Sequence, residues 1–271
     1  MARLDSAVGG EGSRRIRRAI DLASKAWTYF IASLERPRDI PFLLSATIGK
    51  RAHPGQLIRL ARHRKWLTTA GINTAIDVGG HTGQFASALR ALLPNAWIYS
   101  FEPLPDCHAV LSRRLERTGN FKAFQVALGE SPGHATLWRS SFSESSSILP
   151  MSDLHKTAFP WSARNVPVDV KIETLDVFLP EMELRPNVLL KLDVQGFEAK
   201  VLRGALQVLE RVAYVLAEVS FQPLYEGQAS FGEICGFLDT KGFSYAGTLD
   251  QMQSPVDGSI LQADVLFTRV S

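Results

Sequence analysis

Ile76-Asp77-Val78-Gly79-Gly80-His81-Thr82-Gly83 is the most informative stretch of this 271-residue chain. A β-rich run over 74–78 leads into it and a helical pattern over 83–93 follows it, which predicts a turn from a strand into a helix. Its glycines let a ligand approach the backbone closely. The spacing Asp-x-Gly-x-x-x-Gly differs from the Gly-x-Gly-x-x-Gly of dinucleotide-binding turns, and the leading carboxylate suits a positively charged ligand rather than a diphosphate. S-adenosylmethionine, which carries an ammonium and a sulfonium group, is such a ligand; the alternative is a plain glycine-rich turn.

The chain on either side of this turn alternates between short β-rich runs and helical segments. The predicted strands cover 74–78, 96–101, 121–127, 134–139, 166–173, 188–193, 213–219, 243–247 and 263–269. The predicted helices of this region cover 83–93, 105–117, 197–209 and 231–240. Repeated β-α-β units are typical of a parallel, doubly wound sheet, so the predicted fold class is α/β.

A second acidic residue follows the next predicted strand. Glu102-Pro103 ends the run 96–101 and lies one β-α-β unit after Asp77. A carboxylate at this place can accept hydrogen bonds from both hydroxyls of a ribose. A surface glutamate at a strand end is the alternative for Glu102 alone, but the glycine turn at the correct distance upstream favours a cofactor site.

A third group of polar residues ends the predicted central strand 188–193. It reads Lys191-Leu192-Asp193-Val194-Gln195-Gly196-Phe197-Glu198. Charges beside so apolar a run are costly unless they are paired or functional, and ligands of open α/β sheets bind at the carboxyl ends of the strands. Asp193 is therefore a candidate functional residue, whereas the charge of Glu198 is also explained by its place at the start of a helix.

Five motifs in this order resemble the FkbM family of S-adenosylmethionine-dependent methyltransferases. They are Asp77–Gly83, Phe101-Glu102-Pro103, Ala127-Leu128-Gly129, Glu173-Thr174-Leu175-Asp176 and Lys191–Glu198. The resemblance extends over residues 72–268. It implies a class I methyltransferase fold, which is Rossmann-like and doubly wound, with a mostly parallel seven-stranded sheet and a reversed last strand. It also implies O-methyl transfer, in many cases to a sugar hydroxyl of a glycan, a glycolipid or a natural product.

The resemblance also implies roles for individual residues toward the cofactor. The loop at its methionine side would comprise Asp77, Gly79, Gly80, His81 and Gly83. The ribose would lie at Glu102 and Pro103, the adenine at Val126 and Ala127, and the transferred methyl group at Asp193. Two positions depart from the family pattern, since Gly80-His81 stands where Ala-Asn is usual and Phe197 where a small residue is frequent. His81 could contact the cofactor, transfer a proton or cap the helix, and Phe197 could narrow the acceptor site.

Methyl transfer to a hydroxyl needs alignment of the two reactants and a group that takes the hydroxyl proton. We expect Asp193 to be that base or to hold it in place, directly or through a divalent metal. Glu198, Glu218 and His81 are the second-choice catalytic groups. Carboxylate oxygens suit Mg²⁺, but no ligand set in the sequence requires a metal.

The segment 140–165 between two predicted strands is long, and long loops are often functional lids. Its serines 145–147 could bind hydroxyls of the acceptor, and Trp138 and Trp161 could stack on a sugar. Alternatively the serines form a solvated loop and the tryptophans belong to the core.

Charge is unevenly distributed along the chain. Residues 1–66 hold 14 Lys+Arg against 5 Asp+Glu, and the remaining residues hold 16 against 22. We therefore expect a basic helical arm over 1–70 and the methyltransferase domain over 71–271. A first helix, 14–34, has an apolar face and an arginine-rich face, so it could lie on an anionic membrane or pack on the domain. A second basic helix is predicted over 55–70.

Composition excludes several classes of protein. Hydrophobic residues make up 45% of the chain, so it is not wholly disordered, and its two cysteines cannot build a disulfide scaffold or a zinc ribbon. Without a signal peptide or a run of 18 apolar residues, a cytoplasmic enzyme is expected, with peripheral contact to the inner membrane face through residues 14–35 as a hypothesis. The expected partner is a small-molecule or glycan acceptor rather than nucleic acid. RNA ribose methylation, and a non-enzymatic docking role at a membrane or a partner, are the alternatives.

Overall fold

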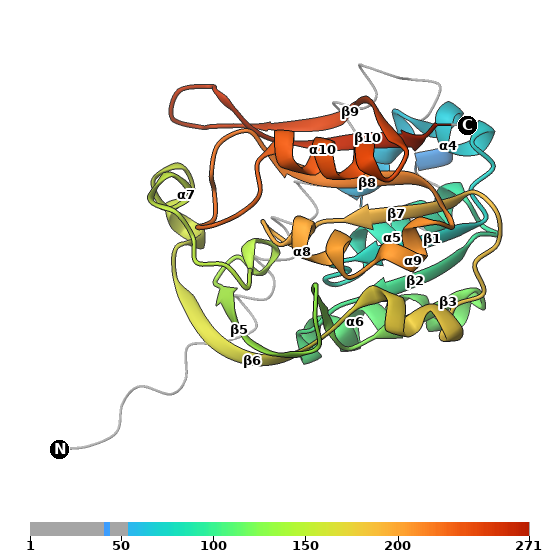
Figure 1. The fold of residues 1–271 in the computed structure, drawn as a ribbon, viewed down its shortest axis with the longest axis horizontal. Coiled ribbons are helices and arrows are strands. Elements are labelled where there is room, and N and C mark those ends of the chain that lie inside the picture. Colours follow the sequence, from blue (N-terminus) through green and yellow to red (C-terminus); the bar gives the residue numbers. More distant parts are fainter. Residues whose placement is uncertain (1–40, 44–53, 271) are drawn as a thin grey trace.

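A seven-stranded sheet forms the centre of the computed structural model, which describes residues 41–43 and 54–270. The strand order is β3-β2-β1-β7-β8-β10-β9 (Figure 1). The strands are β1 Thr74–Val78, β2 Trp97–Phe101, β3 Phe121–Phe124, β7 Val188–Leu192, β8 Val212–Ser220, β9 Phe243–Gln253 and β10 Ile260–Arg269. The five strands from β3 to β8 in this order are parallel, and β10 is antiparallel to both of its neighbours. The predicted α/β fold, with a mostly parallel sheet and a reversed last strand, is confirmed.

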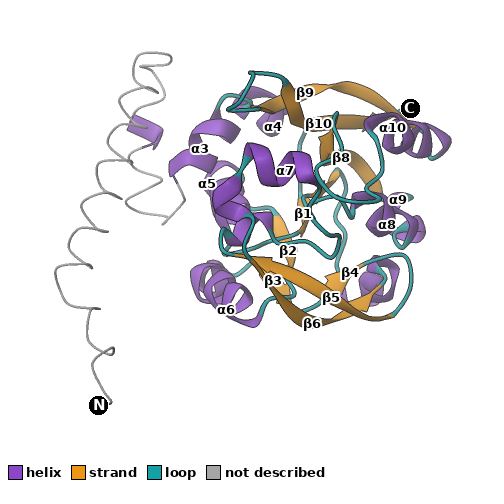
Figure 2. Ribbon diagram, turned by 90° about the vertical axis from the view of Figure 1, so that its left-hand side faces the viewer, coloured by secondary structure: helices purple, strands orange, loops and turns teal. Residues whose placement is uncertain are grey.

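Helices cover both faces of this sheet (Figure 2). One face carries α3 Pro54–Ala61, α4 Arg64–Thr69, α5 Gln84–Leu92 and α6 Pro105–Leu115. The other carries α8 Glu198–Arg203, α9 Leu206–Leu209 and α10 Phe231–Thr240. Leu189 and Leu190 are neighbours in β7 and both are fully buried, yet they belong to different cores. The reason is that successive side chains of a strand point to opposite faces of the sheet.

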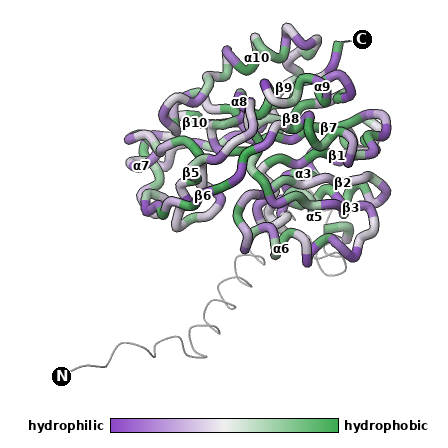
Figure 3. Tube along the Cα trace, turned by 60° about the horizontal axis from the view of Figure 1, so that its bottom comes forward, coloured by the Kyte–Doolittle hydropathy of each residue, from purple (hydrophilic) through white to green (hydrophobic). Residues whose placement is uncertain are grey.

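The central strands β1 and β7 are buried along their whole length. Parallel strands that are covered on both faces are apolar on both sides, and Figure 3 shows these strands within the hydrophobic interior. The charged exceptions are Asp77 in β1 and Lys191 in β7, which are direct partners in the register of the two strands. The functional site therefore begins where the apolar pattern of both strands is interrupted.

A second sheet has three strands in the order β4-β6-β5. Its strands are β4 Ala127–Leu128, β5 Gly133–Ser140 and β6 Asn165–Glu173. The single strand predicted over 121–127 is therefore wrong, because the chain leaves the main sheet after Phe124 and Ala127 then pairs with Ile172 of β6. Cys107 of α6 and Leu137 of β5 are buried in the small core that this sheet forms with α6.

Two of the predicted helices are each interrupted. The helix predicted over 55–70 is divided into α3 and α4, and His63 at the break places its Nε2 atom 2.8 Å from the carbonyl oxygen of Leu249 in β9. The helix predicted over 197–209 is divided into α8 and α9 at Gly204. A Cβ atom there would lie 2.0 Å from the carbonyl oxygen of Gly129, so the close approach of these two backbones requires a glycine. The remaining elements are α7 Asp153–Ala158 and the short 3-10 helices η2 Glu116–Thr118, η3 Ser143–Ser145, η4 Pro160–Ser162 and η5 Leu175–Glu181.

The N-terminal part of the described chain is packed on the sheet. Leu57 of α3 and Leu67 of α4 are buried in the same core as Ala75 of β1. The domain boundary predicted after residue 70 stays a prediction. The helix predicted over 14–34 lies outside the described residues, and among those that are described no helix is long and apolar enough to cross a membrane.

Candidate active site

A cavity of about 380 Å³ opens at the carboxyl ends of β1, β2 and β7. Ligands of doubly wound sheets bind at this edge. Most of the site residues predicted from the sequence line the cavity: Gly79, Gly80, His81, Glu102, Pro103, Val126, Ala127, Asp193 and Glu218. Asp77, Gly83 and Glu198 are not among the lining residues and lie behind its wall.

The turn between β1 and α5 is shaped by positive φ angles. Gly79 has φ 82°, and a Cβ atom there would lie 1.8 Å from the carbonyl oxygen of Asp193, so only glycine fits. Gly83 has φ 80° and approaches Leu111 of α6 closely. His81 has φ 45° without being a glycine. Its backbone N–H donates to Glu102 Oε2 at 2.8 Å, which joins the turn to the end of β2.

Glu102 is buried at the end of β2, and both of its oxygens accept backbone hydrogen bonds. Oε2 accepts from His81 and Oε1 from the N–H of Leu104, each at 2.8 Å. Burial raises the pKa of this carboxyl to about 7. Each carboxylate oxygen has a second lone pair, so Glu102 can still accept hydrogen bonds from ligand hydroxyls on its cavity side.

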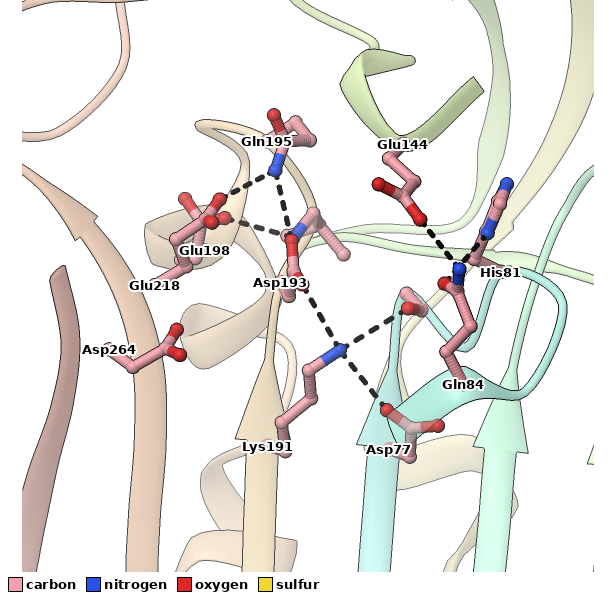
Figure 4. A network of polar contacts seen from close by, with 12 residues as sticks. Asp77, His81, Gln84, Glu144, Lys191, Asp193, Gln195, Glu198, Glu218 and Asp264 are labelled. Carbon is pink, nitrogen blue, oxygen red and sulfur yellow. Dashed lines mark hydrogen bonds and ion pairs between the residues drawn. The ribbon is translucent and has the colours of Figure 1, made fainter. Parts of the chain in front are cut away.

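Lys191 joins the carboxylates of two neighbouring strands (Figure 4). Its Nζ atom lies 3.2 Å from Asp77 Oδ1 and 3.4 Å from Asp193 Oδ2, and it donates to the carbonyl oxygen of Gly79 at 3.3 Å. Burial opposes its charge, but Asp193 and Asp77 raise the pKa of Lys191 above its usual value. Burial also opposes ionisation of Asp193, yet Lys191 and a hydrogen bond from Gln195 hold the pKa of Asp193 below its usual range. Asp193 is therefore ionised near neutral pH and is a weak base.

Gln195 connects Asp193 with the rest of the site, and the sequence analysis did not single it out. Its side-chain amide nitrogen donates to Asp193 Oδ1 at 3.0 Å and to Glu218 Oε2 at 2.5 Å (Figure 4). Its Oε1 atom accepts from the hydroxyl of Tyr225 at 2.6 Å, and its backbone carbonyl accepts from Ser147 Oγ at 2.6 Å. The positive φ of 54° at this non-glycine residue, which the sequence does not reveal, orients it for these contacts.

The other two predicted carboxylates differ in their surroundings. Glu198 Oε1 accepts from the backbone N–H groups of Val194 at 2.9 Å and Gly196 at 3.2 Å, so it holds the loop after β7 in shape. Glu218 of β8 lines the cavity, and burial together with the nearby Asp193 charge raises its pKa well above the usual value. The catalytic roles predicted for these carboxylates stay predictions.

The segment 141–164, between β5 and β6, covers one side of the cavity. Its Ser143 places Oγ 2.8 Å from His81 Nε2. Gln84 of α5 donates to Glu144 Oε1 at 2.7 Å, and Figure 4 shows this second contact. Trp161 also lines the cavity and is 59% exposed, whereas Trp138 is not among the lining residues. The hydroxyl of Ser147 holds the segment to the loop after β7. The covering segment thus lies against both the glycine turn and that loop.

Three further lining residues were missed by the sequence analysis. Gln56 and Arg59 come from α3, outside the region of family resemblance, and His155 comes from α7. No motif marks them, because only packing brings these helices to the cavity. The described part of the chain contains no group of three or more His, Cys, Asp or Glu residues placed to hold a metal ion, so the predicted Mg²⁺ gains no support.

The cavity fits S-adenosylmethionine by the chemistry of its wall. The Glu102 carboxylate beside the glycine turn suits ribose hydroxyls, and Val126 and Ala127 offer an apolar surface for a purine. The volume is within the range of small-molecule sites, roughly 300–1,000 Å³.

Several known proteins are similar to this chain. Residues 77–245 match the methyltransferase FkbM domain. The 2-O-methyltransferase NoeI of Sinorhizobium fredii is 27% identical over 169 residues, which are 60% of this chain and 70% of that protein. Methyltransferase 1 of Beauveria bassiana is 28% identical over 187 residues, which are 63% and 72% of the two chains. The crystal structure of magnesium protoporphyrin IX methyltransferase from Synechocystis, with bound S-adenosylmethionine, matches 80% of each chain with 13% identity and a TM-score of 0.43.

Proposed function

This chain belongs to the FkbM family of S-adenosylmethionine-dependent methyltransferases, and on that premise we propose that it methylates a hydroxyl group of a sugar. The sugar belongs to a glycan, a glycolipid or a natural product. The observation that carries the proposal is the part of the cavity wall that the segment between β5 and β6 forms. There the exposed Trp161 and the hydroxyl-rich stretch Ser143–Ser147 line the same cavity.

An indole face and several hydroxyls suit the two sides of a sugar. The C–H face of a sugar ring packs on an aromatic ring, and serine hydroxyls or backbone carbonyls can pair with sugar hydroxyls. Phe142 and Phe159 add further aromatic surface to the same wall. The relative NoeI is named a 2-O-methyltransferase, which supports transfer to oxygen.

The cofactor is assigned to the wall formed by the ends of β1 and β2. Gly79, Gly80 and His81 would contact its methionine side, Glu102 and Pro103 its ribose, and Val126 and Ala127 its adenine. Asp77 and Gly83 would act indirectly, because Asp77 fixes Lys191 and Gly83 shapes the turn. When bound, the cofactor supplies an electrophilic methyl group on a sulfonium.

The residues of the chain would contribute mainly alignment. Holding a hydroxyl oxygen in line with the methyl carbon can contribute about 7–11 kcal/mol in favourable cases. Asp193 is held ionised by Lys191 and Gln195, so it would orient the acceptor hydroxyl rather than keep its proton. Glu218 and His81 are the remaining predicted groups that line the cavity and could pair with the acceptor.

The proposal is tested by cofactor binding and by methyl transfer. Calorimetric titration with S-adenosylmethionine would compare the wild type with Glu102→Ala and with Glu116→Ala, a change at an exposed glutamate of η2. Binding lost in Glu102→Ala and kept in Glu116→Ala would support the cofactor site. Transfer of a tritiated methyl group would then be measured on methyl glycosides, UDP-sugars, GDP-sugars and total RNA. Label in RNA with none in any sugar would overturn the acceptor assignment in favour of ribose methylation.

A further inference from the structure

Glu218 lies at the carboxyl end of β8, beside Asp193 at the end of β7. The two strands are parallel, and their last paired residues are Leu192 and Ala217. Asp193 and Glu218 come next along each strand and are therefore neighbours. The side-chain amide of Gln195 donates to both carboxylates, at 3.0 Å to Asp193 Oδ1 and at 2.5 Å to Glu218 Oε2 (Figure 4). Glu218 is partly buried and lines the cavity, so it lies on the side to which the proposed function assigns the acceptor hydroxyl.

The two oxygens of Glu218 differ in their contacts. Oε2 accepts from the Gln195 amide and, at 3.1 Å, from the side-chain amide of Gln262 in β10. Oε1 has no hydrogen-bond partner within the described residues, and it is not one of their fully buried, unpaired atoms, so it keeps accessible surface. Glu218 lines both the cavity and a side pocket of about 60 Å³, and the two spaces share Asp193 as a lining residue. A hydroxyl bound beside Asp193 can therefore reach Oε1.

The other carboxylates that line the cavity in the described part of the chain have different surroundings. Glu102 accepts backbone hydrogen bonds through both of its oxygens at the glycine turn. Glu144 is exposed and accepts a hydrogen bond from the first residue of α5. Asp193 is held ionised by Lys191 and is a weak base. Of the two carboxylates at the reacting side, Glu218 is thus the one that has no cation partner among the described residues.

Ionisable groups from several neighbouring elements face Glu218. The acidic groups at the end of β7, on β10 and on α8 are Asp193, Asp264 and Glu198. The other groups are Lys191 of β7, Arg59 of α3 and the hydroxyl of Tyr225. Burial and the three acidic groups raise the pKa of Glu218 well above its usual value, and Lys191 opposes them in part. A carboxylate with a raised pKa is a stronger base, and a general base is most effective when its pKa is near the operating pH.

We propose that Glu218 is the general base of the reaction and that its Oε1 atom receives the proton of the acceptor hydroxyl. This inference rests on the proposed O-methyltransferase function. As the hydroxyl oxygen forms its bond to the methyl carbon, the carbon–sulfur bond breaks and its electron pair returns to sulfur. The hydroxyl proton moves to Oε1, while Oε2 keeps its hydrogen bonds from Gln195 and Gln262. A general base of this kind contributes roughly 10²–10⁴-fold to the rate.

Three variants separate this role from a structural one. Glu218→Gln is isosteric and can still accept from both amides, but it cannot take a proton. Glu218→Asp keeps a carboxylate that is one methylene farther back. Glu210→Gln, at an exposed glutamate after α9, is the matched control. On the best acceptor of the tritium assay, we expect kcat of Glu218→Gln to be at least ~100-fold below that of the control. Its Tm should not fall, because the amide removes a charge that burial and the acidic neighbours oppose.

The pH profile of kcat, measured at saturating cofactor, identifies the group that takes the proton. In the wild type, kcat should increase with pH as Glu218 ionises, because a general base acts in its unprotonated form. Asp193→Asn and Glu218→Asp should keep this acidic limb, and the residual rate of Glu218→Gln should lack it. An acidic limb that persists in Glu218→Gln would overturn the inference, as would kcat of Glu218→Gln within threefold of the wild type.

The ionisation of Glu218 is measured without any acceptor. ¹³C spectra of wild type labelled at the glutamate Cδ atoms, assigned through Glu218→Gln and Glu210→Gln, should show that Glu218 titrates at a higher pH than Glu210. Titration of both residues at the same pH would overturn the inference. If label appears in RNA rather than in a sugar, the proposed acceptor fails, and the same variants compared on RNA decide the case for Glu218. If neither is labelled, the titration decides it.

Discussion

Tyr225→Phe removes one hydroxyl that joins the covering segment to Gln195. The side chain of Tyr225 is fully buried, and its hydroxyl lies 2.6 Å from Gln195 Oε1 and 3.3 Å from the carbonyl oxygen of Ser145. Losing a neutral hydrogen bond costs about 1 kcal/mol, and an acceptor left buried without a donor costs about 1–3 kcal/mol. Gln195 is half-buried, so water can partly replace the lost donor. We therefore expect the free energy of unfolding to fall by about 1–2 kcal/mol.

Thermal unfolding and kinetics would measure this effect. For a chain of this size, 1 kcal/mol corresponds to about 2–4 °C, so Tm should fall by about 2–8 °C. Without the Tyr225 hydroxyl, the Gln195 amide is no longer fixed toward Asp193 and Glu218, and kcat should fall by about tenfold, which corresponds to 1.4 kcal/mol. The affinity for S-adenosylmethionine should be unchanged.

Tyr245→Phe is the matched control, because Tyr245 of β9 is 53% exposed and its hydroxyl makes no hydrogen bond within the described residues. If Tyr225→Phe and Tyr245→Phe had the same Tm and the same kcat, the reasoning that Gln195 is held through the Tyr225 hydroxyl would be refuted.

Four further predictions concern the glycine turn and the carboxylates at the cavity. In Gly79→Ala, the added Cβ atom would overlap the carbonyl of Asp193. We expect calorimetry to detect no cofactor binding and denaturant unfolding to show a free energy lower by about 1–3 kcal/mol. Binding at wild-type affinity would contradict this prediction. Asp193→Asn should lower kcat by at least tenfold in the tritium assay while the cofactor Kd changes little, and equal rates would remove Asp193 from the reacting side. Affinity for S-adenosylmethionine should rise as pH increases through about 7, because the Glu102 carboxyl loses its proton there. The carboxylate then accepts hydrogen bonds from the ribose hydroxyls. The affinity of Glu102→Gln should show no such rise. Folding raises the pKa of Glu102 and of Glu198 from 4.5 to about 7, so between these pH values the folded chain binds more protons than the unfolded chain. Stability should therefore decrease as pH increases from about 4.5 to 7, and the urea midpoint should decrease with it.

Local sequence patterns were enough to predict the β-α alternation, the glycine turn and the acidic residues that follow β2 and β7. These features depend on local chemistry. Periodicity reports which side chains are buried, and Gly79 is required by its own positive φ. For the same reason, five short motifs in order were enough to predict the family to which the chain belongs. The start of α8 at Glu198 agrees to within one residue with the helix predicted over 197–209.

Which of these residues act together depends on contacts between distant parts of the fold. Asp77 is 114 positions from Lys191 in the sequence, and the two meet because β1 and β7 are neighbours in register. Glu198 holds the loop after β7 instead of lining the cavity, because its Oε1 atom accepts hydrogen bonds from the backbone N–H groups of Val194 and Gly196. His155 has no motif around it, and only the packing of α7 brings it to the cavity. Such contacts depend on the register of strands and the docking of segments far apart in the chain, which no local pattern encodes.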